Sequence, residues 1–277
     1  MRIYGIDFTC APGPRKPITV AACELDGDRL VLADLLRLRT LDHFERALAE
    51  PGPWVAAMDF PFGLPRSVVR GLGWPPAWSD YVEHAASLGK AGYEQALTEH
   101  RRSQPAGRRH PLRVTDRLAR GQSPVMLHGV PLAKMFFAGA PRLLRSPLSI
   151  LPCRPTTDPR VVLEAYPGCA ARKLLLARRG YKGEGRTRQT PAQRQGRAEL
   201  LEALTGRRVR GVYELGVEIN RFRRDQLLDD AQGDLVDALL AAVQAAWACR
   251  RRECNWGLPV ACDPAEGWIA DPACLRA

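Results

Sequence analysis

Apolar and polar positions alternate with the period of a β-strand through most of the first 40 residues. The segments 1–9, 17–25 and 29–38 are therefore expected to be three strands. An Asp-Gly-Asp turn at 26–28 separates the second from the third and is typical of a β-hairpin. The pattern predicts that the chain begins with an antiparallel meander.

A helix and a fourth strand are expected next. Thr40 is a good N-cap for a helix over 41–50, which a Pro-Gly-Pro sequence then ends. The run 54–59 is short and apolar and ends in an acid, which is typical of a strand buried on both faces of a sheet. The predicted order is β-β-β-α-β, with this strand parallel to the first.

The segment 61–155 has a different character, because it is rich in Pro, Gly, Arg and His and contains only short helical stretches, at 79–88 and 93–101. We interpret it as a helical and irregular insertion within one domain that covers residues 1–277. Three aromatic residues are expected to form the core of the insertion: Trp74, Trp78 and Tyr81.

Mixed α/β structure is expected after the insertion. The pattern predicts a strand over 161–166, helices over 170–179 and 191–204, a long Ala-rich helix over 226–252, and a short strand at 267–270. The apolar stripe of the long helix should contain Leu235, Leu239, Val243, Ala246 and Trp247.

Five acids occupy positions that could converge. Asp7, Asp59 and Glu164 lie at or near the ends of predicted strands, and Asp234 and Asp237 share one face of the long helix. The carboxyl ends of parallel strands meet at one edge of a sheet, so Asp7 and Asp59 should be neighbours. A helix that crosses this edge would bring the other two aspartates to them.

Clustered carboxylates repel one another unless they are protonated or bridged by hard cations such as Mg²⁺ or Mn²⁺. A pair of such ions activates water and stabilises the leaving oxygen in phosphodiester hydrolysis. Each acid alone also has a structural explanation, as a turn former or a helix-terminal charge. Asp237 is the hardest to explain in that way, because it interrupts an apolar stretch.

The charge balance points to a polyanionic partner. The net charge is +11, and residues 172–210 contain twelve Lys and Arg against three Glu, a local excess of 12 − 3 = +9. Lys182 is expected to clamp a phosphate or to stabilise transition-state charge, although a solvated surface lysine is an alternative. Arg186, Arg188 and Arg197 could follow a nucleic-acid backbone.

The sequence contains no apolar run long enough to span a membrane and no signal peptide. Its eight cysteines form no CxxC pair, so free thiols in a reducing cytoplasm are expected. The sequence gives no indication of the oligomeric state.

Four motifs, taken together, resemble the DUF429 family, which is described as predicted nucleases of the ribonuclease H-like fold. The resemblance runs from residue 1 to about 270. It implies a ribonuclease H-like mixed sheet flanked by helices. The motifs are Gly5-Ile6-Asp7-Phe8-Thr9, Met58-Asp59-Phe60-Pro61-Phe62-Gly63-Leu64-Pro65, Glu164-Ala165-Tyr166-Pro167 and Asp234-Leu235-Val236-Asp237-Ala238-Leu239-Leu240-Ala241-Ala242.

The acidic pattern also resembles that of Holliday-junction resolvases of the RuvC type. Those enzymes hold a glutamate where this chain has Asp59. The likeness implies no role for Glu164, which could be a further ligand, could orient a ligand, or could pair with Lys182 or an arginine. It implies four metal ligands: Asp7, Asp59, Asp234 and Asp237.

The expected function is therefore a metal-dependent nuclease that acts on DNA or RNA through carboxylate-bound Mg²⁺ or Mn²⁺, with Glu164 also at the catalytic site. Two alternatives remain open. One is a nucleotide-binding phosphotransferase or ATPase-like protein on the same core, since the segment 5–9 faintly resembles a phosphate loop. The other is a non-catalytic nucleic-acid-binding protein.

Overall fold

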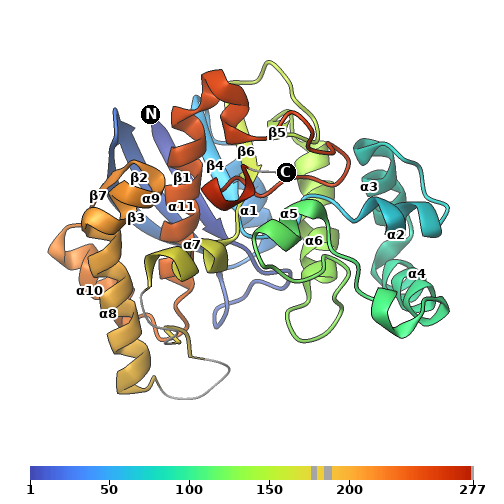
Figure 1. The fold of residues 1–277 in the computed structure, drawn as a ribbon, viewed down its shortest axis with the longest axis horizontal. Coiled ribbons are helices and arrows are strands. Elements are labelled where there is room, and N and C mark those ends of the chain that lie inside the picture. Colours follow the sequence, from blue (N-terminus) through green and yellow to red (C-terminus); the bar gives the residue numbers. More distant parts are fainter. Residues whose placement is uncertain (176–179, 184–188, 276–277) are drawn as a thin grey trace.

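The computed structural model describes residues 1–175, 180–183 and 189–275, which form an α/β fold around one mixed sheet (Figure 1). The strand order across the sheet is β5-β6-β4-β1-β2-β3-β7. The strands are β1 (Arg2–Asp7), β2 (Ile18–Asp26), β3 (Arg29–Leu38), β4 (Trp54–Met58), β5 (Ser149–Leu151), β6 (Arg160–Glu164) and β7 (Gly216–Glu218).

The predicted β-β-β-α-β start is confirmed. Strands β1, β2 and β3 pair antiparallel, and β4 lies parallel to β1 on its other side. The helix α1 (Leu41–Leu48) connects β3 to β4, and the hydroxyl of Thr40 caps it by accepting a hydrogen bond from the backbone N–H of His43 at 3.1 Å. Strands β6 and β5 extend the parallel half of the sheet beyond β4.

Helices cover both faces of the sheet (Figure 1). Alternate residues of the central strands face opposite sides, as Val55 and Ala57 pack with the α7–α11 side while Ala56 and Met58 pack with the α1–α6 side. The remaining helices are α2 (Arg66–Gly71), α3 (Trp78–Ser87), α4 (Gly89–Ser103), η1 (Ala106–Arg108), α5 (Val114–Leu118), α6 (Leu132–Arg145), α7 (Pro167–Leu174), α8 (Pro191–Thr205), α9 (Arg207–Tyr213), α10 (Arg221–Asp229), α11 (Asp234–Arg250), η2 (Arg252–Gly257) and η3 (Pro272–Cys274).

The segment 61–155 is more regular than its composition predicted. Its helices include α6, which contains Pro141 and was not expected from the sequence. Gly139 of this helix lies against the ring of Phe60, and a Cβ there would come within 2.4 Å of the ring. The aromatic core expected for the segment is confirmed, since Trp74, Trp78 and Tyr81 are all buried.

The prediction of one helix over 226–252 is wrong. The chain forms α10 and α11 instead, and Gly233 between them adopts a left-handed φ of +73° that a helix cannot contain. The predicted apolar stripe is also incomplete, because every residue of 234–249 is buried. The helix α11 is thus an interior helix, and Asp234 and Asp237 lie in its first turn.

Two smaller elements differ from expectation. The helix α7 begins at Pro167 rather than at 170, and the last four residues predicted for it, 176–179, lie outside the described residues. The strand expected at 267–270 is a single bridge between Ile269 and Glu164.

Among the described helices, none is both long and apolar enough to cross a membrane.

Gly5 allows α11 to lie directly on β1. A Cβ at this position would fall 1.9 Å from the carbonyl oxygen of Ala238 and 2.1 Å from the backbone nitrogen of Ala242. Both obstacles are backbone atoms of a buried helix, so neither yields easily. The absence of a side chain at Gly5 therefore fixes the distance between α11 and the end of β1.

Replacing Gly5 with Ala should destabilise the protein by about 3 kcal/mol or more, because the extra methyl group overpacks a rigid interface. Chemical denaturation measures this loss. Gly13→Ala is the matched control, since a Cβ at Gly13 has no neighbour within 4 Å. A loss of stability at Gly5 no larger than that of the control would show that α11 does not press on β1.

Candidate metal centre

The side chains of Asp7 and Asp59 point to the same face of the sheet. Ile3 packs on the α11 face, and Asp7 is four residues further along β1, so its side chain points to that face. Asp59 directly follows β4, two residues after Ala57, which also packs on the α11 face. The backbone N–H of Asp59 donates to the carbonyl of Ile6 at 2.9 Å and holds the two strand ends together.

The helix α11 brings a third carboxylate to this edge. Carboxylate oxygens of Asp7, Asp59 and Asp237 all lie within 4.8 Å of one another. The three acids come from three separate elements, two strand ends and the first turn of a helix. The positive end of a helix dipole also favours an acid in this first turn.

Asp234 lies beside this group and has its own partner. Both oxygens of its carboxylate accept hydrogen bonds from the ammonium of Lys16 at 2.7 Å. Its carbonyl accepts the hydroxyl of Thr19 at 2.8 Å, which ties the start of α11 to β2. Its charge nevertheless helps raise the pKa of Asp7. Its assignment as a metal ligand stays a prediction.

The proximity of the acids shifts their protonation. Burial, together with the charges of Asp234 and Asp59, raises the pKa of Asp7 from 3.8 to about 8, although Lys182 and Lys16 lower it. Burial also raises the pKa of Asp59 to about 7, and Glu164 adds to the rise while Lys182 opposes it. Without a compensating cation, the site therefore holds protons at neutral pH.

Tyr181 and Lys182 both contact Asp237. The hydroxyl of Tyr181 donates to one carboxylate oxygen at 2.7 Å, and the ammonium of Lys182 pairs with the other. The helix α8 holds this segment, since Gln193 donates to the carbonyl of Lys182 at 2.8 Å and Arg197 donates to the carbonyl of Tyr181 at 2.7 Å. The predicted basic segment is thus in contact with the acids.

The remaining basic residues have different places. Arg197 is fully buried, and its guanidinium also donates to the carbonyl of Leu228. It has no exposed surface for a substrate, so the prediction that Arg197 contacts nucleic acid is wrong. Its hydrogen bond to the carbonyl of Tyr181 instead holds Tyr181 in place. Arg186 and Arg188 lie outside the described residues.

Glu164 lines the same cavity as Asp59 and Asp237 but lies outside the group of three converging acids. It pairs in register with Met58 on β4, so strand parity directs its side chain to the face opposite that of Asp59. There the guanidinium of Arg113 binds both of its carboxylate oxygens, and the backbone N–H of Phe62 donates to one of them at 2.9 Å. Burial raises the pKa of Glu164, and Arg113 opposes this rise. Of the roles considered for Glu164, the structure shows an ion pair with an arginine.

Sequence reasoning missed Arg113 and Lys16. Arg113 is buried and also pairs with Asp116 at 2.7 Å. The Arg-x-x-Asp spacing at 113–116 is a signal that could have identified this pair. Lys16 lies in a Pro-rich turn before β2, and nothing in its local sequence indicates a partner 218 residues away.

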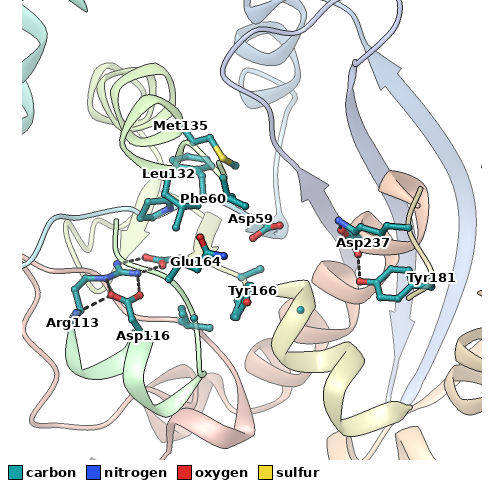
Figure 2. A pocket seen from close by; sticks show the side chains of 18 residues that line it. Asp59, Phe60, Arg113, Asp116, Leu132, Met135, Glu164, Tyr166, Tyr181 and Asp237 are labelled. Carbon is teal, nitrogen blue, oxygen red and sulfur yellow. Dashed lines mark hydrogen bonds and ion pairs between the residues drawn. The ribbon is translucent and has the colours of Figure 1, made fainter. Parts of the chain in front are cut away.

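A cavity of about 320 Å³ opens beside the acids. Figure 2 shows Asp59 between two groups of side chains, with Asp237 on one side and the apolar Phe60, Leu132 and Met135 on the other. The ion pair of Arg113 and Glu164 and the side chain of Tyr166 complete the lining. Asp59 and Asp237 thus line a cavity that is partly open to solvent.

Comparison with known proteins gives one family. The family model described as "Protein of unknown function (DUF429)" matches residues 5–257, which is nearly the whole chain. Neither a curated protein nor a solved structure matches the chain. The chemistry of the site therefore has to be argued from its own geometry.

Proposed function

We propose that this chain, which belongs to the DUF429 family, is a metal-dependent nuclease that hydrolyses phosphodiester bonds of DNA or RNA. The observation that carries the proposal is the convergence of Asp7, Asp59 and Asp237 within 4.8 Å at the carboxyl ends of β1 and β4. Three acids this close together, of which Asp7 and Asp237 are buried and Asp59 is half-buried, are unfavourable unless a cation or protons compensate them.

The topology supports a ribonuclease H-like core. An antiparallel meander, β3-β2-β1, continues across the sheet into the parallel strands β4 and β6. The insertion lies between the strand before Asp59 and the strand that ends at Glu164. This arrangement agrees with the order expected from the DUF429 resemblance.

The donor set fits Mg²⁺ or Mn²⁺. Both ions prefer carboxylate oxygens and water to nitrogen or sulfur, and no thiol or imidazole belongs to the described group. Asp7, Asp59 and Asp237 would hold the metal, with Asp234 available if it exchanges its Lys16 partner. When bound, such ions activate water and stabilise the departing oxygen of a phosphodiester.

The surrounding side chains position the substrate and the acids. Lys182 has an ammonium that is 40% exposed beside Asp237, so it is placed to bind a phosphate that reaches the acids. Tyr181 orients Asp237 through its hydroxyl. Glu164 and Arg113 hold the loop after Asp59 through the hydrogen bond from Phe62.

A cleavage assay with single- and double-stranded DNA and RNA tests the proposal. The proposal predicts products only with Mg²⁺ or Mn²⁺ present, and none after chelation. Cleavage that persists in excess chelator would overturn it, as would the absence of cleavage of all four substrates together with the absence of any metal-induced stabilisation.

We expect Mn²⁺ to stabilise the protein more at pH 8 than at pH 6. The unfolded aspartates lose their protons near pH 3.8, whereas folded Asp59 and Asp7 keep theirs until about pH 7 and 8. The stability that these protons contribute is full below pH 3.8 and is lost as pH rises through 7 and 8. Mn²⁺ has to displace the same protons, so its binding strengthens over this range.

Thermal unfolding with and without Mn²⁺ measures the effect. A metal concentration a hundredfold above the dissociation constant raises the free energy of unfolding by about 2.7 kcal/mol. Asp237→Asn should lose this gain, and an equal ionic strength of KCl should not reproduce it. A gain that is equal or larger at pH 6 would count against metal binding by these acids.

A further inference from the structure

The geometry points to a substrate preference: we infer that the cavity beside the acids receives one unpaired nucleotide. Its base would lie against Leu132 and Met135, and its phosphate would face Lys182 and the acids. The inference rests on the proposed function and names the substrate class of the same site.

The size of the cavity limits its occupant. Its volume of about 320 Å³ is near the lower end of the range in which proteins enclose small molecules. A space of this size accommodates a single nucleotide but not a base pair with two backbones. A strand therefore reaches the enclosed part of the site one nucleotide at a time.

One wall of the cavity is apolar and partly open to solvent. Leu132 and Met135 of α6 are half-buried, and Val130 just before this helix is 48% exposed. Phe60, in the loop after β4, lies behind this wall, because its side chain is only 1% exposed and packs against Gly139 (Figure 2). Apolar side chains that face an open cavity are typical of a ligand site, and extruded bases are held between such side chains.

The charges fix the orientation of the nucleotide. All five N–H donors of Arg113 are engaged, with Asp116, Glu164 and the carbonyl of Glu266. This trio of one arginine and two acids carries a net charge of −1 when both acids are ionised, so Arg113 offers a phosphate neither a free N–H donor nor net positive charge. Lys182 pairs with Asp237, which Figure 2 shows across the cavity from Arg113.

An unpaired nucleotide suits this site better than a paired one. A base in a duplex must leave its stack and its partner before it can enter, whereas a bulged or terminal base has already lost part of those interactions. We therefore expect preference for strands that carry an unpaired base.

Fluorescence anisotropy in EDTA tests the inference without any cleavage. The probes are a labelled DNA duplex, the same duplex with one bulged adenosine, and the same duplex with an abasic bulge. The bulged adenosine should bind roughly tenfold more tightly than the other two. Equal affinity for the three probes would overturn the inference.

Matched variants locate the preference in the cavity. Met135→Glu should abolish the preference for the bulged base, and Met135→Leu should keep it. Val260→Glu adds the same charge at a side chain that is 98% exposed and is not part of the cavity, so it should also keep the preference. A preference that survives Met135→Glu would contradict the assigned position of the base.

A competition arm separates the source of the nucleotide. In this arm, adenosine monophosphate competes with the bulged probe. Displacement of the probe at the same concentration as the unlabelled strand requires would support a nucleotide site in the cavity but would overturn the inference that the nucleotide belongs to a strand.

The inference and the proposed function can also fail separately. Equal binding of the three probes with Mn²⁺-dependent cleavage removes only the inference, whereas a bulge preference without cleavage removes only the nuclease.

Discussion

Asp59→Asn is expected to reduce metal-dependent cleavage by about a thousandfold, because carboxylate-held cations contribute several kcal/mol of transition-state stabilisation. Asp59 sits at the centre of the site, where the backbone fixes it to Ile6 and its carboxylate lies within 4.8 Å of those of Asp7 and Asp237. Asparagine keeps the size of the side chain but removes its charge. The assay compares initial rates in Mn²⁺ for the two proteins.

The same variant should not lose stability in the absence of metal. Burial and neighbouring acids raise the pKa of Asp59 to about 7. Above that pH the carboxyl ionises at a cost in folding free energy, and a neutral asparagine avoids this cost. Its melting temperature at pH 8 without metal should equal or exceed that of the unchanged protein. Asp225→Asn on the surface of α10 is the matched control and should cleave normally. Full activity in Asp59→Asn would remove Asp59 from the mechanism.

Arg113→Met should destabilise the protein by about 3–5 kcal/mol, because it leaves buried carboxylates without their counter-charge. The guanidinium is 2% exposed and binds both Asp116 and Glu164. Met fills much of the same space, so the loss reports the charge rather than a cavity. Urea denaturation at pH 7 measures it.

Two comparisons test the reason for that loss. The loss should shrink as the pH is lowered, because burial raises the pKa of Glu164 and a protonated carboxyl needs no counter-charge. Arg117→Met on the exposed side of the same helix, α5, should change stability by less than about 0.5 kcal/mol. Equal losses at Arg113 and Arg117 would show that the ion-pair network is not a structural support of the site.

The strands β1, β2 and β3 were predictable because their alternation is strong and their ends carry clear turn signals, whereas β5 and β7, of three residues each, are too short for such a pattern and were not predicted. Register parity also explains the acids: Asp7 and Asp59 continue the α11 side of their strands, whereas Glu164 follows the parity of Met58 and faces the insertion. The same parity could have been applied to the sequence, and it would have separated Glu164 from the aspartates.

Other features depend on contacts that no local pattern contains. Gly233 breaks the long helix because the chain turns there against Lys182, although a single glycine is often tolerated within a helix. Lys16 meets Asp234 across most of the chain. Residues of α6 line the cavity. This helix contains Gly139 and Pro141, which are unfavourable within helices, so its sequence resembles an irregular segment.

Anomalous diffraction at the manganese edge, from crystals soaked in Mn²⁺, shows directly whether the three acids bind a metal. We expect a peak bounded by the carboxylates of Asp7, Asp59 and Asp237, with the ammonium of Lys182 moved away from Asp237. Crystals in which Lys182 stays paired with Asp237 and no peak lies between these three acids would contradict metal binding by these acids.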